Sequence, residues 1–356
     1  MPAAPPLWPT GLNATQRRQL AAAPLLVRAW PHGPRDGAII QNDYYHVYTT
    51  IQNPLQRRLI IRVLDAAYAR FLRLVPDARP PRPLVGYVFR NRRQWARFTR
   101  KTTGGMASLY LRIRAGGYER TGVFVLWRTT VPEALSVLAH EAWHQLSFTA
   151  LKNHLPAWLD EGLATQNEAM QWRDGRPRFT PWRNQPRWLA LRFAMANRRL
   201  LPLKELVVTQ AGDVIVQSST DIQTYYAEVW SLMLYLEHSR YRGDLLGLLE
   251  AARRGKLTAF LDHTGLTPRQ IADESVRWNS LAGIILLRVF FSEHISRMQR
   301  RYLAFIRRLT RSWPPMMESL TVGPGGGNPA CPGAAPGLER RRGAMFRVTG
   351  IKSLSG

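Results

Sequence analysis

Two histidines and a glutamate lie within five residues of one another in the segment LAHEAWHQL. His140 and His144 are four residues apart, a spacing that places both imidazoles on one side of a helix. Two histidines in this arrangement can bind one zinc ion, with nitrogen–zinc distances of about 2.0–2.1 Å. Glu141 would lie beside the ion, where a general base takes a proton from water. The segment therefore predicts a zinc-binding helix that carries its own base.

The residues before this motif predict where the helix starts. Thr130 and Glu133 have the spacing of a capping box, and Pro132 between them suits a first helical turn. The two histidines then fall on the third and fourth turns. Apolar residues occupy the positions that would face a core: Leu135, Leu138, Ala139, Ala142 and Leu146.

A catalytic zinc site needs a third protein ligand and one open position. Four downstream side chains are candidates: His154, Asp160, Glu161 and Glu168. Asp160 and Glu161 belong to PAWLDEGLA, which is typical of a second helix docked on the first. The competing interpretation makes both histidines ordinary surface or core residues and Glu161 a first-turn helix acid.

The segments HEAWH and PAWLDEGLA together resemble the gluzincin metallopeptidases, in which a Glu in a W-L-x-E-G-x-A segment is the third zinc ligand. The aminopeptidase N family carries a similar segment at a comparable distance. The likeness is closer to an uncharacterised bacterial family of predicted peptidases described as peptidase MA-like. It spans roughly residues 40–265 and is specific at the two zinc segments. It implies that His140, His144 and Glu161 bind one zinc ion and that Glu141 is the base.

The predicted mechanism also needs a donor for the oxyanion. Tyr226 is the first candidate, because the helix YAEVWSLMLYL that it opens would pack near the zinc helices. Tyr225 and His238 are the alternatives. A purely structural role for Tyr226, packed against Trp230 one turn further on, is the competing interpretation.

An endopeptidase is the more plausible kind of peptidase. Aminopeptidase N relatives carry a Gly-x-Met-Glu-Asn segment that binds the substrate amino terminus. The segment GGMAS (Gly104 to Ser108) lies at a loosely similar distance but lacks the Glu and the Asn. A substrate main chain could pair with an exposed strand edge. GVFVLWRT (Gly122 to Thr129), immediately before the zinc helix, is expected to be that edge strand.

The remaining sequence predicts an α+β fold of the zincin-like type. A β-rich segment at 39–51, helical spacing at 54–75 and a short buried strand at 83–89 indicate a twisted mixed sheet with helices. The zinc helix follows, and the second half is mostly helical. Residues 276–313 predict one or two packing helices, with a membrane-surface helix as the alternative.

The expected domain organisation has three parts. Residues 1–37 are rich in Pro, Ala and Arg and predict a loosely ordered extension. Residues 38–312 form one catalytic domain, with a sheet-containing half (38–150) and a helical half (151–312). Residues 313–356 predict a low-complexity, disordered tail.

Composition limits the classes of partner. Lys and Arg number 50 against 24 Asp and Glu, giving a formal net charge of +26. Such a charge attracts anionic surfaces nonspecifically. The arginines are spread along the chain, so no dedicated nucleic-acid site is predicted. The single cysteine, Cys331, excludes an intramolecular disulfide and a cysteine-rich metal site.

The sequence also bears on location and on activity. No apolar stretch reaches the roughly 18 residues of a transmembrane helix, and the N-terminus lacks the pattern of a signal peptide. The chain as given is expected in the cytoplasm, or in the cell envelope or secreted if an upstream export signal is missing. The predicted function is zinc-dependent hydrolysis of peptide or protein substrates. The alternatives are a catalytically silent zincin-like scaffold and a basic nucleic-acid-associated factor.

Overall fold

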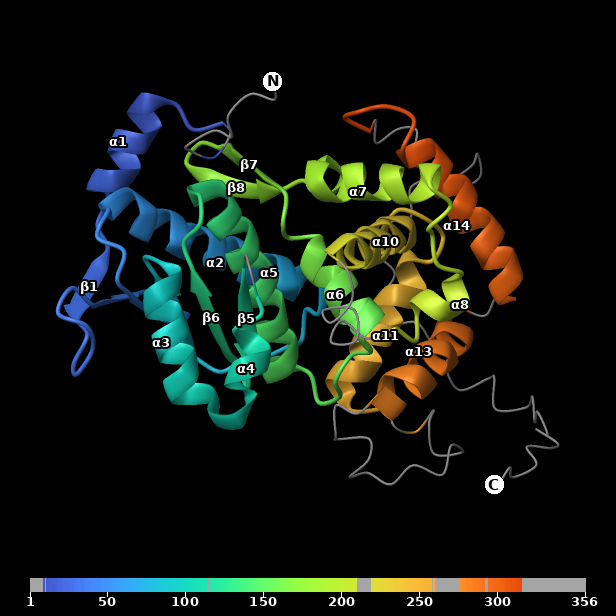
Figure 1. The fold of residues 1–356 in the computed structure, drawn as a ribbon, viewed down its shortest axis with the longest axis horizontal. Helices are drawn as coiled ribbons and strands as arrows, with labels where there is room; N and C mark the ends of the chain where they lie inside the picture. Colours follow the sequence, from blue (N-terminus) through green and yellow to red (C-terminus); the bar gives the residue numbers. More distant parts are fainter. Residues whose placement is uncertain are drawn as a thin grey trace. The chain divides into compact units, whose positions relative to one another are not determined.

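A six-stranded mixed sheet forms the N-terminal half of the protein in the computed structural model (Figure 1). The structure describes residues 9, 11–113, 116–209, 219–257, 259, 276–291 and 294–315. The strand order is β1-β2-β3-β4-β6-β5, in which β3, β4 and β6 are parallel and the outer strands pair antiparallel. The strands are β1 Leu26–Ala29, β2 Ala38–Gln41, β3 Tyr45–Thr49, β4 Leu84–Phe89, β5 Gly117–Arg120 and β6 Val123–Trp127.

Helices cover both faces of the sheet. Strand side chains alternate between the faces, so Phe124 and Leu126 of β6 join the main core while Val125 and Trp127 join a smaller second core. The helices α2 (Pro54–Leu74) and α5 (Val131–Ala150) contribute to the main core. The helix α3 (Arg92–Thr103) covers the second core with Trp95, and the short turns η1 (Gly104–Met106) and α4 (Ala107–Tyr110) follow it.

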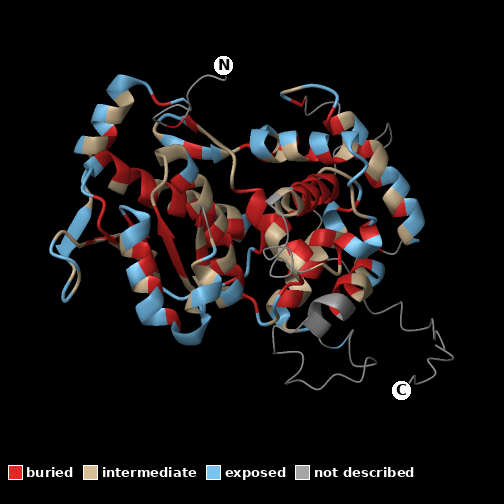
Figure 2. Cartoon of the chain, viewed as in Figure 1, coloured by how far each residue is buried: buried red, intermediate tan, exposed pale blue. Residues whose placement is uncertain are grey.

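The C-terminal half is mostly helical and is built around α10 (Ser219–Glu237). Eight consecutive residues of this helix, Val229 to Leu236, are buried, so neighbours pack against it on every side (Figure 2). The other elements are α6 Ala157–Thr165, β7 Met170–Arg173, β8 Arg176–Phe179, η2 Pro181–Arg183, α7 Gln185–Ala196, α8 Leu203–Leu206, α11 Arg242–Arg254, α13 Val276–Phe291 and α14 Ile295–Leu309.

The described part of the chain confirms an α+β fold with a mixed sheet in the first half and helices in the second. The predicted packing helices at 276–313 correspond to α13 and α14. The helix α14 turns a row of apolar residues into the main core, including Met298, Tyr302 and Phe305. None of the described helices is long and apolar enough to span a bilayer.

Two expectations are corrected by the structure. Within 1–37, residues Ala14–Ala22 form the helix α1, which packs on α2, and β1 pairs with β2; the predicted loose extension is wrong for these residues. A capping box of Asn13 and Gln16 starts α1, and Leu20 is its buried residue. GVFVLWRT is also not an edge strand. It forms β6, which lies between β4 and β5, so the edge strand is β5.

The predicted disordered tail lies almost wholly outside the described residues, which end at 315. The described residues all belong to one compact unit, Met1–Thr321. No domain boundary therefore divides the sheet half from the helical half.

Close packing of α6 on α10 depends on a glycine. A methyl group at Gly162 would lie 2.6 Å from Met233 Cγ and 3.1 Å from the Val229 carbonyl oxygen. Both distances are shorter than side-chain packing allows, so only glycine permits this approach of the two helices. Glu161 precedes Gly162, and the same approach therefore determines where its carboxylate lies.

Replacement of Gly162 by alanine should destabilise the protein. We expect Gly162→Ala to lower the free energy of unfolding by about 1–3 kcal/mol through overpacking, measured by denaturant titration. Gly247 of α11 is the matched control, because nothing lies within 4 Å of a methyl group there. Gly247→Ala should raise the free energy of unfolding by up to about 1 kcal/mol, the helix preference of alanine over glycine. Equal effects at the two positions would contradict the close-packing argument.

Candidate metal centre

Three side chains from α5 and α6 converge to form a group that could hold a metal ion. His140 Nε2 and His144 Nε2 lie 3.1 Å apart. Glu161 Oε2 lies 3.2 Å from the first nitrogen and 3.4 Å from the second. The helix α5 places the two imidazoles one turn apart on the same side, and α6 brings the carboxylate across from them. The structure thus brings together the three residues predicted as ligands.

The chemistry of these three atoms fits a zinc ion. Ligands at about 2.0–2.1 Å in a tetrahedron are separated by roughly 3.3–3.4 Å, close to the separations in this group. Glu161 Oε2 is buried and accepts no hydrogen bond of acceptable geometry from the described residues. An unpaired carboxylate oxygen facing two ring nitrogens requires protons or a cation between them. Two imidazoles and a carboxylate are also a donor set that zinc accepts.

The other ring nitrogen of each histidine is held by a carboxylate. His140 Nδ1 lies 3.0 Å from Glu168 Oε1, and His144 Nδ1 lies 2.8 Å from Asp160 Oδ2. Such carboxylates fix the orientation of the ring and leave Nε2 free for the metal. Asp160 is itself fixed by Trp143 Nε1, which donates to its Oδ1 at 2.8 Å. Asp160 and Glu168 were candidates for the third ligand; in the structure they orient the histidines instead.

Glu168 is anchored by an arginine that the sequence did not single out. Arg187 Nε and Nη2 donate to the two carboxylate oxygens of Glu168 at 2.8 and 2.7 Å. The Arg187 guanidinium also lies over the ring of Tyr226, 4.8 Å from its centroid. Arg187 belongs to α7, and no spacing in the sequence connects it with the zinc helix. Only the folded chain shows that it reaches the site.

The charged groups of the site shift the pKa values of its two histidines and of Glu161. Burial alone would lower the pKa of His140, but the neighbouring carboxylates of Glu161 and Glu168 outweigh it and raise the pKa to about 9. The pKa of His144 is likewise raised, because Asp160 and Glu161 outweigh the effect of burial. Burial would raise the pKa of Glu161, yet the two histidines lower it well below its usual range. The carboxylates and the imidazoles of this group thus stabilise one another's charges.

Glu141 lies beside the group and is buried, with 8% of its surface exposed. Burial raises the pKa of its carboxyl group, and the nearby histidines act in the opposite direction. The backbone amide of Glu119, on β5, donates a hydrogen bond to it. A buried carboxyl group with a raised pKa, next to the metal-binding group and held by the edge strand, has the chemistry to accept a proton.

Tyr226 is close to the group and its two alternatives are occupied elsewhere. Its ring centroid lies 6.2 Å from that of His140. The Tyr225 hydroxyl instead faces the Thr209 carbonyl at 3.5 Å. The partners that shift the pKa of His238 are Glu237, Arg242 and Arg70, outside the metal-binding group. Tyr225 is near enough to Glu161 for that charge to help raise its pKa, and Tyr226 is the candidate whose ring contacts a histidine of the group.

The candidate ligand His154 lies outside the group. Its ring packs against Phe148, with the centroids 5.5 Å apart. GGMAS, compared above with an amino-terminus-binding segment, forms η1 and the start of α4 rather than a strand beside the zinc helix. Neither His154 nor the GGMAS segment contributes to the metal-binding group.

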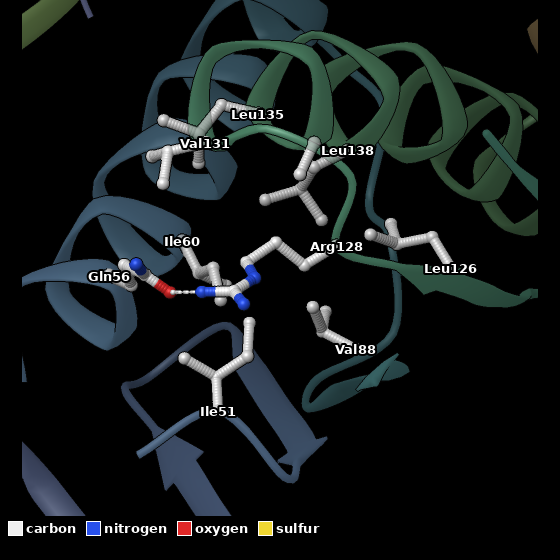
Figure 3. Close-up of a pocket in the computed structure, with 10 residues that line it drawn as sticks. Ile51, Gln56, Ile60, Val88, Leu126, Arg128, Val131, Leu135 and Leu138 are labelled. Atoms are coloured by element: carbon white, nitrogen blue, oxygen red, sulfur yellow. Dashed lines mark hydrogen bonds between the residues drawn. The ribbon is translucent and has the colours of Figure 1, made fainter. Parts of the chain in front are cut away.

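A small cavity lies apart from this group, at the carboxyl ends of the parallel strands (Figure 3). Its volume is about 20 Å³, enough for roughly one water molecule. Apolar side chains of α2, α5 and the strands line it, and Arg128 projects into it and donates to Gln56 Oε1 at 3.3 Å. None of the predicted site residues lines the cavity, so the two features are separate.

The raised pKa of His140 predicts different pH dependences for the metal-free and zinc-loaded protein. A pKa of about 9 in the folded state, against about 6.5 unfolded, stabilises the metal-free fold fully below pH 6.5. This stabilisation is lost as the pH rises through 9. Zinc needs a neutral imidazole, so the zinc-loaded protein neither gains nor loses a proton at His140 on unfolding above pH 6.5. In denaturant titrations the free energy of unfolding should therefore fall between pH 6.5 and 9 with chelator and stay nearly constant with saturating zinc.

His154 supplies the control for this measurement. His154→Gln should keep the difference between the two pH profiles, and His140→Gln should remove it. Parallel slopes with chelator and with zinc would show that protons and zinc do not compete for this site.

Comparison with known proteins finds a match to one family model, whose description gives no activity. A family model described as "Protein of unknown function (DUF1570)" matches residues 134–257, which are 124 of the 356 residues. The matched range contains the metal-binding group, Glu141 and Tyr226. No curated protein and no solved structure matches the chain. The range matched by the family model thus includes the helices that carry the site.

Proposed function

We propose that this protein is a zinc-dependent metallopeptidase that acts as an endopeptidase. One observation carries the proposal: the Nε2 atoms of His140 and His144 and the carboxylate of Glu161 converge, while each Nδ1 is held by another carboxylate. Glu141 lies beside this group with the chemistry of a general base. A site that only stabilised the fold would not need a buried carboxyl group next to a metal ion.

The chain's own residues would divide the chemistry of hydrolysis among them. When bound, zinc would polarise the scissile carbonyl and acidify a water molecule. Glu141 would take the proton from the attacking water and transfer it to the leaving amine. Tyr226 would donate its hydroxyl hydrogen to the developing oxyanion. Burial raises the pKa of Tyr226 well above its usual value, so the hydroxyl stays protonated and can donate.

The strand β5 is the best platform for a substrate. It pairs with β6 on one side only, leaves its other edge unpaired by any described strand, and packs on α5. An extended peptide could add to this edge by main-chain hydrogen bonds. The one acidic residue of β5, Glu119, accepts a hydrogen bond from the Gly122 amide at the turn. It is therefore engaged within the protein, which favours an endopeptidase over an enzyme that binds a free amino terminus.

A catalytically silent scaffold is the second candidate function. The bound metal would then have only a structural role. The buried position of Glu141 beside the metal-binding group favours the peptidase. A role as a nucleic-acid factor has only the net charge of +26 in its favour.

Loss of the base should abolish hydrolysis and leave the metal in place. Glu141→Gln should lower the rate of cleavage of a mixed peptide library by about 10²–10⁴ and keep stoichiometric zinc. The control is Glu133→Gln on the same helix, since glutamine also serves in a capping box. It should cleave as the unchanged protein does, and a chelator should stop it. Cleavage that survives both Glu141→Gln and the chelator would overturn the proposal.

Removal of the Tyr226 hydroxyl should affect the transition state rather than binding. Tyr226→Phe should lower kcat by about 10²–10³, leave KM nearly unchanged and retain zinc. Tyr225→Phe is the control, because the neighbouring hydroxyl faces Thr209. Full activity of Tyr226→Phe would assign the oxyanion to another donor.

A further inference from the structure

One stretch of the chain combines a high density of positive charge with a complete absence of acidic residues. Residues 78–118 contain ten Lys or Arg and no Asp or Glu, whereas the whole chain has about two basic residues for each acidic one. The centre of this stretch is α3, followed by η1 and α4 on the outer side of the smaller core (Figure 1). Four of these ten residues lie at positions 93, 97, 100 and 101 of α3.

The helix α3 separates its apolar and basic residues cleanly. Trp95, Thr99 and Thr103 are buried on the sheet. Arg93, Arg97, Arg100 and Lys101 follow the i, i+4, i+7, i+8 pattern of the opposite face, and all four are exposed (Figure 2). We call these four residues the basic row.

The basic row differs from the neighbouring arginines in its ion pairs. Two neighbouring arginines have partners: Arg90 pairs with Asp36 at 3.2 Å, and Arg92 donates to the Leu111 carbonyl at 2.8 Å. None of the four residues of the basic row pairs with an acidic group among the residues that the structure describes. Four cations held side by side without a counter-ion repel one another, and an anionic partner would relieve that repulsion.

Exposed apolar side chains lie directly after the basic row. Met106 of η1 is 46% exposed and Leu109 of α4 is 37% exposed. The aromatic side chains of this region, such as Phe98 and Tyr110, pack on the smaller core instead. A basic face beside exposed aliphatic residues is the pattern of a surface that binds a bilayer interface. Single-stranded nucleic acids use exposed aromatic rings, which this face lacks.

We propose that the basic row, with Met106 and Leu109, binds the surface of an anionic lipid bilayer. The four cations contact headgroup phosphates and carboxylates, and the two aliphatic side chains enter the interface below them. This surface is distinct from the metal centre, so the proposal does not depend on peptidase activity.

The test is sedimentation of the full-length protein with lipid vesicles. Binding to phosphatidylcholine vesicles that contain about 30% phosphatidylserine should exceed binding to pure phosphatidylcholine at least tenfold at physiological salt. Arg97→Glu with Lys101→Glu should reduce binding to the anionic vesicles at least tenfold. If the protein with reversed charges does not fold, the milder pair Arg97→Gln with Lys101→Gln is used instead, and it should also weaken binding to the anionic vesicles.

A matched pair of substitutions separates the local surface from the net charge. Arg176 and Arg178 of β8 are also exposed, and Arg176→Glu with Arg178→Glu changes the total charge equally. This pair should weaken binding less than about twofold. An equal loss for the two pairs would overturn the proposal, because net charge alone would then explain binding.

The apolar part is tested separately. Met106→Ser with Leu109→Ser should weaken vesicle binding at least threefold and leave binding to a DNA duplex unchanged. Vesicle binding that does not respond to these two substitutions would overturn the proposal in favour of a general polyanion surface.

Discussion

The candidate site depends on pairing charges that are buried together where α5, α6 and α7 meet. Isolated ions in such a place would cost several kcal/mol each. Here the histidines of α5 face Asp160 of α6 and Glu168 just after it, and Arg187 of α7 pairs with Glu168, all at hydrogen-bonding distances. The pairs draw partners from three helices and from the chain between them. The same contacts that shape the site therefore also hold the helical half against the sheet half.

Much of the site was predictable because its signals are local. The four-residue step between His140 and His144, the Thr130–Glu133 capping box and the short distance to PAWLDEGLA all act within one or two helices. Local hydrogen bonds and helical periodicity decide such features, and the surrounding fold changes them little. The capping box predicted at Thr130 is present, and the helix begins at Val131.

The parts that were not predictable depend on contacts between distant segments. Asp160 and Glu168 could be recognised as acids near the zinc helix, but their distances to Nδ1 rather than Nε2 follow only from the docking of α6 and of the chain after it. Arg187 lies 43 residues beyond His144 and reaches the site because α7 packs on α10.

The edge strand was missed for another reason. β5 has only four residues, GYER, and lacks the apolar run of a buried strand. The uninterrupted apolar run VFVLW of β6 is typical of a strand that is covered on both faces. This run indicates a strand inside the sheet, and the expectation of an edge strand did not take it into account.

The pairing of charges has a consequence for the exchange of metal. His140 Nδ1 faces Glu168 and His144 Nδ1 faces Asp160, and Arg187 holds Glu168 in turn. None of these contacts uses an Nε2 atom. The gain or loss of an ion would therefore change the contacts of the Nε2 atoms and leave these outer contacts, which orient both rings, in place.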